Sequence, residues 1–269
     1  MAVMALNSAA TGLRALSTRI DVIANNLANA ETVAFKRSRM NFEDLMYLML
    51  KQPGATNSEG DPAPSGTFVG LGVRISNTQL DTEQGPIEMT NRQLDVAISG
   101  EGFFKVKTLS TIGDGFAYTR NGNLFVNTKG TLVIGIGDGY RLQPEITIPQ
   151  GTTDIIIGEN GGVDVLVKGS ATKQNVGQLK LSQFINPQGL KLLGGGLYIP
   201  TESSGEPYDS LPGENGSGRV LQGALEGSNV DPVKELVSLI KTQRAFELNS
   251  QSIQTADQAL QTIGNLRRF

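Results

Sequence analysis

The chain has 269 residues, with 23 basic and 26 acidic side chains that give a formal net charge of −3, and it contains no Cys, no His and no Trp. These absences exclude disulfides, zinc sites with Cys or His ligands, and every Ser-His or Cys-His catalytic arrangement. The balanced charge gives no basic stripe of the kind that nucleic-acid-binding proteins carry. Because no run of about 18 apolar residues occurs, the sequence predicts no direct membrane insertion.

The N-terminus lacks the pattern of a cleavable secretion signal. The first basic residue is Arg14, and Asn7, Ser8 and Thr11 interrupt the apolar stretch. We therefore expect either a cytoplasmic protein or one that is exported without a cleavable signal peptide.

Gly and Pro are distributed unevenly. Only Gly12 precedes position 54 and only Gly264 follows position 227, and every Pro lies between Pro53 and Pro232. Because these residues mark turns and interrupt helices, the pattern predicts helical ends and a turn-rich β middle. The predicted fold class is α+β, with N- and C-terminal heptad helices that pair as a coiled-coil domain and a mainly antiparallel β domain between them.

Apolar residues at the N-terminal end form two rows with a seven-residue period, which is an a/d heptad seam. The predicted seam residues are Leu6, Ala9, Leu13, Leu16, Ile20, Ile23 and Leu27. Such narrow seams are typical of helices that pair with other helices. The alternative, two amphipathic helices that lie on the chain's own β body, stays open at this point.

The C-terminal end repeats this pattern, with a second row that is smaller and more polar. Asp231 is a suitable N-cap and Pro232 suits the first helical position, so the helix is expected to begin there. The predicted C-terminal seam consists of Leu239, Phe246, Ile253, Ala256, Leu260 and Ile263.

The middle of the chain reads as short strands separated by turns, which favours an antiparallel sandwich or barrel. Residues 117–126 are predicted to form a hairpin around Asn121-Gly122. The other predicted strands are 68–80, 94–106, 131–136, 153–157, 163–168, 178–185 and 219–225.

Motifs of catalytic chemistry are weak. The glycine-rich stretch 135–139 is followed by an extended segment that ends at Pro144, where a dinucleotide site would need a helix. A glycosidase-like carboxylate pair, Glu83 with Asp95 or Glu101, depends on a spatial separation that sequence does not give. We expect no catalytic residues, no cofactor and no metal.

Three amides in five residues, Asn25, Asn26 and Asn29, close the predicted N-terminal helix. Asn is a weak helix former, so helix termination is one interpretation, and side-chain hydrogen bonds across a packed interface are the other. Together with Phe35 and Lys36, these residues resemble the N-terminal signature of the axial proteins of the bacterial flagellum, the rod and hook subunits. The resemblance continues through residues 95–104, 118–122, 228–230, 235–237 and 243–250.

Within that family the chain is most similar to distal rod subunits, because a Pro- and Gly-containing segment follows the first helix. This segment includes Gln52, Pro53, Gly54, Pro64, Ser65 and Gly66. The resemblance implies an N-terminal helical part at 1–46, a distal-rod-type extended segment at 47–74 that contacts other subunits, a β domain at 75–227 and a C-terminal helix at 228–269. Two departures are Ala34, where the family usually has Gly, and a long loop at 108–115.

The resemblance also implies a function and partners. The chain would be a non-enzymatic subunit of a rigid tube that transmits torque from motor to hook, with the helices inside and the β domain outside. Its partners would be copies of itself, proximal rod subunits, the hook protein or an adapter, and surrounding ring proteins. The alternatives are a hook or proximal rod subunit, a secreted adhesin or carbohydrate-binding β protein, and a carboxylate enzyme that cleaves polysaccharide.

Overall fold

A computed structural model describes residues 2–54, 64–108, 113–135, 139–169 and 172–266. The contacts divide the chain into two compact units. We call residues 1–28, 38–79 and 231–269 the helical unit, and residues 29–37 and 80–230 the β body. The expected boundaries differ from this division, since 29–37 groups with the β body and 38–79 groups with the helices.

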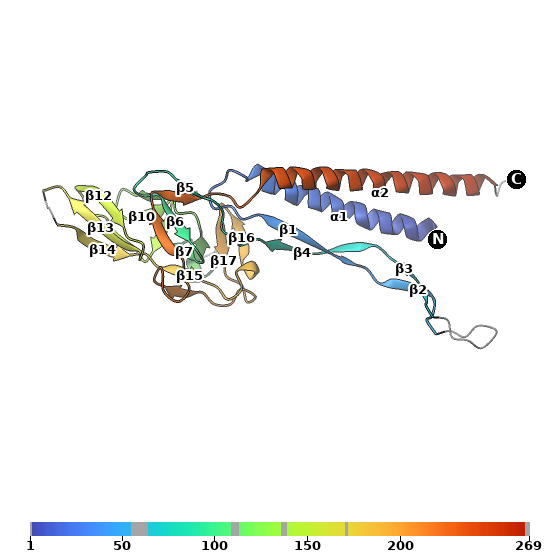
Figure 1. Ribbon diagram of the computed structural model, residues 1–269, viewed down its shortest axis with the longest axis horizontal. Helices are drawn as coiled ribbons and strands as arrows, with labels where there is room; N and C mark the ends of the chain where they lie inside the picture. The colour runs from blue at the N-terminus through green and yellow to red at the C-terminus, as the bar shows by residue number, and fades with distance from the viewer. Residues whose placement is uncertain (1, 55–63, 109–112, 136–138, 170–171, 267–269) are drawn as a thin grey trace. The chain divides into compact units, whose positions relative to one another are not determined.

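The helical unit contains two long helices, α1 (Ala2–Ala28) and α2 (Pro232–Leu266), which pack against each other (Figure 1). Their contact is close where α1 has a glycine: a Cβ at Gly12 would lie 3.3 Å from the amide nitrogen of Asn249. The chain thus forms the two terminal helices and the mainly antiparallel β middle that the sequence predicts.

The start of α2 follows its local sequence signals. Asp231 Oδ1 accepts hydrogen bonds from the backbone N–H groups of Val233 (3.1 Å) and Lys234 (3.2 Å), as an N-cap does. These contacts, with the Lys234 hydrogen bond first, lower the pKa of Asp231. The predicted helix start is therefore confirmed.

Four strands complete the helical unit as two antiparallel pairs: β1 (Ser38–Asp44) with β4 (Val73–Leu80), and β2 (Tyr47–Lys51) with β3 (Thr67–Gly70). We call this extended structure the arm. Ser8 and Thr11 of α1 hydrogen-bond to it through Gly70 O and Val73 N. Gly72, at φ +118°, lies against Thr11 so closely that a Cβ would collide with the hydroxyl, so this approach requires glycine.

The β body is antiparallel in every pairing that the structure describes. Its largest sheet follows the order β16-β17-β8-β7-β11-β10-β9, with β15 also on β7 and β18 on β15. The strands of this sheet are β7 (Phe103–Lys107), β8 (Phe116–Thr119), β9 (Leu124–Val126), β10 (Leu132–Ile134), β11 (Tyr140–Gln143), β15 (Leu181–Gln183), β16 (Lys191–Gly194), β17 (Leu197–Ile199) and β18 (Tyr208–Ser210).

Smaller sheets and two 3₁₀ turns complete the body. The sheets are β12 (Thr152–Ile157), β13 (Gly162–Val167) and β14 (Gln174–Gln178); β6 (Val96–Ser99) with β19 (Arg219–Gln222); and β5 (Ile87–Met89) with β20 (Ala224–Glu226). The 3₁₀ turns are η1 (Gly113–Gly115) and η2 (Pro187–Gly189).

Two apolar cores stabilise the β body. The larger consists of aliphatic side chains around Phe104, drawn from strands of several sheets, and the smaller is aromatic. In the smaller core, the rings of Phe103 and Tyr118 each meet Phe184 edge to face, at 5.7 and 4.9 Å between centroids, and Tyr198 meets Phe103 at 5.6 Å. Burial is the main reason that the pKa values of Tyr118 and Tyr198 are raised to about 12.

The predicted hairpin at 117–126 is wrong. Strand β8 pairs with β7 and β17, whereas β9 pairs with β10, so the two are not partners. Gly122 is not a turn glycine here. Its backbone passes so close to β6 that a Cβ at this position would collide with Val96 O. A tertiary contact therefore overrides the Asn-Gly turn signal.

Three predicted strands are each divided in two, and one of them, 219–225, becomes β19 and β20 on either side of Gly223. The expected strand 68–80 is interrupted at Gly72 and becomes β3 and β4, and the expected strand 94–106 is interrupted between β6 and β7. Between β6 and β7, Gly100 (φ +111°) and Gly102 (φ +135°) adopt backbone angles that other residues rarely reach. Strand β1 lies within residues 1–46, where the resemblance implied helix, because α1 ends at Ala28.

Candidate functional site

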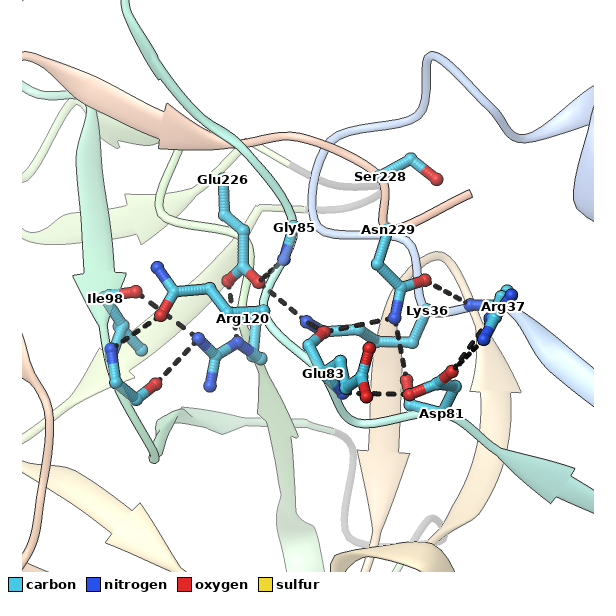
Figure 2. Close-up of polar contacts among 12 residues, drawn as sticks. Lys36, Arg37, Asp81, Glu83, Gly85, Ile98, Arg120, Glu226, Ser228 and Asn229 are labelled. Atoms are coloured by element: carbon cyan, nitrogen blue, oxygen red, sulfur yellow. Dashed lines mark hydrogen bonds and ion pairs between the residues drawn. The ribbon is translucent and has the colours of Figure 1, made fainter. Parts of the chain in front are cut away.

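A buried ion cluster in the β body joins residues from three distant parts of the sequence (Figure 2). Glu226 of β20, whose side chain is fully buried, receives Lys36 Nζ on Oε1 and Arg120 Nε on Oε2, each at 2.7 Å. The backbone N–H of Gly85 also donates to Oε1, at 3.0 Å. Because a buried charge is costly unless it is paired and hydrogen-bonded, these contacts explain how a carboxylate is accommodated here.

Backbone carbonyls accept further hydrogen bonds from the two cations. Arg120 donates to Gly102 O (3.0 Å) and Gly100 O (2.9 Å), and Lys36 Nζ donates to Glu83 O. Burial, followed by the adjacent Arg120 charge, lowers the pKa of Lys36, and the Glu226 carboxylate opposes that shift. The cluster is thus a connected polar network in the interior of the β body.

A second group, Arg37, Asp81 and Asn229, lies beside this cluster (Figure 2). Arg37 pairs with Asp81 (Nη2 to Oδ2, 2.7 Å), and its backbone N–H donates to Asn229 Oδ1 at 2.7 Å. Burial alone would raise the pKa of Asp81, but the Arg37 hydrogen bond and charge outweigh it and the pKa is lowered. Both groups hold chain segments together.

Two residues of the Asn cluster, Asn26 in the helical unit and Asn29 in the β body, make side-chain hydrogen bonds within their own units. Asn26 is 2% exposed and clamps the backbone of Ser38, accepting its N–H at 3.0 Å and donating to its C=O at 2.9 Å. Asn29 Oδ1 accepts the Thr32 hydroxyl at 3.1 Å. The Asn26 side chain thus bonds to a segment of its own chain that follows α1.

The predicted seam residues lie on the less exposed sides of their helices. Ile23 is buried, and the other N-terminal seam residues are half-buried: Leu6, Ala9, Leu13, Leu16, Ile20 and Leu27. In α2 the half-buried seam residues are Leu239, Phe246, Ile253, Ala256 and Leu260, while the side chain of Ile263 lies outside the described residues.

A further apolar row on α2 was not anticipated from the sequence. Its members are exposed, and they are Val233 (70% exposed), Leu236, Val237, Ile240 (57%) and Leu248. At 100° per residue this row lies about half a turn from the seam. The helix therefore presents apolar side chains on two opposite sides.

The arm exposes a third apolar set: Met46, Tyr47, Leu48, Met49, Leu50 and Phe68. Of the predicted extended-segment residues, Gln52, Pro53, Gly54, Pro64 and Ser65 are exposed and Gly66 is half-buried, and the segment between them, 55–63, lies outside the described residues. Gly66 lies against the backbone of Lys51: a Cβ added at Gly66 would be 2.6 Å from the carbonyl oxygen of Lys51.

Of the candidate carboxylates of the enzyme alternative, Asp95 is buried. The Asp95 side chain is 1% exposed, accepts the Thr90 hydroxyl at 2.7 Å and lies 3.5 Å from Arg92. Among the described residues no group of three or more carboxylates is placed to hold a metal ion. Neither α1 nor α2, over its described length, is apolar enough to cross a bilayer.

Comparisons with known proteins match most of the chain. Three family models align in order: the flagella basal body rod protein at residues 6–36, the flagellar hook protein FlgE/F/G D1 domain at 97–165, and the flagellar basal body rod FlgEFG protein C-terminal at 221–266. The flagellar basal-body rod protein FlgG of Caulobacter vibrioides is 44% identical over 264 residues, covering 98% of this chain and 99% of that protein.

The chain belongs to the flagellar basal-body rod protein family. It is a structural subunit of the distal rod of the flagellar basal body. The FlgG protein of Buchnera aphidicola (Schizaphis graminum) is 45% identical over 257 residues, 95% of this chain and 96% of that protein. By contrast, the flagellar hook-basal body complex protein FlhP of Bacillus subtilis is 30% identical over 272 residues, 97% of this chain and 98% of that protein.

In this rod subunit, motif residues that lie far apart in the sequence meet in space. Lys36, Arg120 and Asn229 come from three of the segments that carry the family resemblance, and all three lie in the two polar groups of the β body. Glu226, which joins Lys36 to Arg120, was missed by the sequence analysis. The signal that could have found it is a single acidic residue inside an otherwise uncharged strand, just before the Ser228–Val230 motif.

Proposed function

We propose that this rod subunit self-assembles into a rigid helical tube that transmits motor torque to the hook. In this proposal α1 and α2 pair as a coiled coil in an inner layer, and the β body lies outside it. The observation that carries the proposal is the pair of opposite apolar rows on α2. One row faces α1 within the subunit, and the other is exposed among the residues that the structure describes.

An exposed apolar row of this kind needs burial. Four of its members, Val233, Leu236, Val237 and Ile240, fall within two helical turns, and large contiguous apolar surfaces on a soluble chain mark interaction sites. A contact between this row and a different surface of the next subunit is heterologous, and heterologous contacts that do not close generate an open filament. The exposed apolar side chains of the arm supply a second surface for such contacts.

The remaining assignments follow from the family. We infer that the subunit is not an enzyme, that it is exported without a cleavable signal peptide, and that the tube ends on proximal rod subunits at one side and on the hook protein or an adapter at the other. Ring proteins would surround it. No cofactor or metal is required by any of these contacts.

The test compares two charged substitutions on α2. Ile240→Asp places a carboxylate in the exposed row, whereas Gln243→Asp places one between the two rows, where the side chain is also exposed. We expect Ile240→Asp to give a folded monomer that forms no tubes in negative-stain images of concentrated protein, and Gln243→Asp to assemble like the parent. Normal tubes from Ile240→Asp would contradict the proposal.

A further inference from the structure

The chain passes between the helical unit and the β body four times, after residues 28, 37, 79 and 230. Three of these passages have a member of one polar group within two residues. Arg37 is the last residue before the second passage, Asp81 follows the third closely, and Asn229 shortly precedes the fourth. All three residues belong to the β body.

These residues form a closed triangle of hydrogen bonds and an ion pair (Figure 2). The Arg37 N–H donates to Asn229 Oδ1 (2.7 Å), and Asn229 Nδ2 donates to Asp81 O (3.0 Å). The Arg37 guanidinium pairs with the Asp81 carboxylate (2.7 Å), and the Asp81 N–H donates back to Arg37 O (2.9 Å). Each passage is thus bonded to both of the others.

The buried ion cluster anchors this triangle. Lys36 adjoins Arg37 in the chain and binds Glu226, three residues before Asn229. Backbone bonds run beside it, from Ala34 N to Glu226 O (2.8 Å) and from Asn229 N to Phe35 O (3.2 Å). Releasing one passage segment therefore breaks bonds to the others and exposes part of a buried charge network.

We propose that Arg37, Asp81 and Asn229 act as a load-sharing clamp, which makes three chain passages yield together instead of one at a time. A short segment such as 29–37 would otherwise peel from the β body under tension that reaches it from the helices. The need for such a clamp rests on the proposed function, because a torque-transmitting rod is what puts tension on these passages. The coupling itself is a property of the single subunit.

Amide hydrogen exchange on the full-length monomer tests the coupling. Asn229→Ala removes the acceptor of the Arg37 N–H but not that of the Asp81 N–H, which is Arg37 O. If the passages open as one unit, the amides of both Arg37 and Asp81 lose protection by a similar factor, about tenfold or more. The amides of Ile98 and Phe104 in the core strands keep their protection.

Two results would overturn the clamp. Loss of protection at Arg37 alone would mean that the passages open independently, and an equal loss at Ile98 and Phe104 would mean that Asn229 only stabilises the whole body. Arg219→Met is the matched control, because it breaks an exposed ion pair of the same β body. This pair joins Arg219 to Glu159, and their side chains are 70% and 67% exposed, respectively. It should leave the Arg37 and Asp81 amides unchanged.

Pulling a single full-length chain by its two ends tests the mechanical consequence. The parent β body should extend in one step, and Asn229→Ala should show an earlier step of about 30 Å, the extended length of residues 29–37. An early step in the parent, or none in the variant, would contradict the clamp. Both measurements use the monomer, so they separate failure of the clamp from failure of rod assembly.

Discussion

At the scale of single residues, the two hydrogen bonds between the Asn26 side chain and the Ser38 backbone stabilise the helical unit. Asn26→Ala leaves the N–H and C=O of Ser38 without their side-chain partner in a partly buried setting. We expect this to lower the free energy of unfolding of the helical unit by about 2 kcal/mol. The loss would appear as an earlier fall of the helical circular-dichroism signal on heating.

Asn7 provides the control for this substitution, because it is an exposed Asn of the same helix. Asn7→Ala should change the helical transition by a few tenths of a kcal/mol at most, and Ala's higher helix propensity favours a slight gain. Equal effects of the two substitutions would show that helix propensity, and not the clamp on Ser38, decides the result.

Because two of its tyrosines are buried, we expect the β body to lose stability at alkaline pH. Burial raises the pKa values of Tyr118 and Tyr198 to about 12, against about 10 for an unfolded chain. Below the unfolded pKa both states keep the phenol protons, and stability is unaffected. Between the two values the unfolded chain has released protons that the folded chain retains, so the free energy of unfolding falls as pH rises.

Tyr198→Phe removes one of these groups and should flatten the fall. The measurement is the denaturant midpoint at about pH 9 and at about pH 11, with tyrosinate absorbance as the titration readout. An unchanged alkaline slope in the variant would show that Tyr198 does not carry it.

At the scale of the element, the seam of α1 is where a charge should be least tolerated. Leu13→Asp or Ile20→Asp would bury a carboxylate between helices, which costs several kcal/mol unless the group is paired or neutralised. We expect both variants to remain soluble, to keep the calorimetric transition of the β body, and to form no sedimenting polymer.

Ser17→Asp is the matched control for the seam variants. Arg19 of the same helix is a less suitable control. Its guanidinium carbon lies 5.9 Å from the centroid of the Phe42 ring, so changing Arg19 would also remove a cation–π contact. Ser17 is exposed on the same helix, and its substitution should leave polymerisation nearly unchanged. The inner-layer role of α1 would be wrong if the seam variants polymerised like the parent or lost the β-body transition.

Elements governed by local signals could be predicted from the sequence, and those governed by distant contacts could not. The start of α2 follows from Asp231 and Pro232, which act within one turn, and the positions of the long helices follow from their apolar period. The Asn121-Gly122 turn signal failed because distant contacts fix this segment. Gly122 packs against the backbone of Val96, and Arg120, two residues earlier, pairs with Glu226. Lys36 and Glu226 are 190 residues apart, and no local pattern pairs them.

At the scale of the whole molecule, the arm predicts a mechanical phenotype. Replacing Tyr47, Leu50 and Phe68 together by Ser removes exposed apolar surface without touching the cores of the β body. We expect the triple variant to assemble into tubes that bend more, because contacts that resist sliding between subunits are weaker. Bending stiffness is read from the curvature of single filaments in images.

The matched control replaces Lys51 and Thr67, polar exposed residues of the same strands, by Ser. Tubes of the control should be as straight as those of the parent. Equal curvature in all three proteins would show that the arm does not contribute to stiffness.

The helical unit is discontinuous, and that has a consequence for synthesis. All of residues 80–230 leave the ribosome before the first residue of α2, so the β body can be complete while α1 still has no second helix. At roughly 5–20 residues per second, the roughly 200 residues between the end of α1 and the start of α2 take about 10–40 s to synthesise. A chain that terminates early therefore carries a finished β body but no α1–α2 pair. In this way the fold orders synthesis ahead of the proposed assembly, because a chain must be translated beyond the β body before it presents the exposed apolar row of α2.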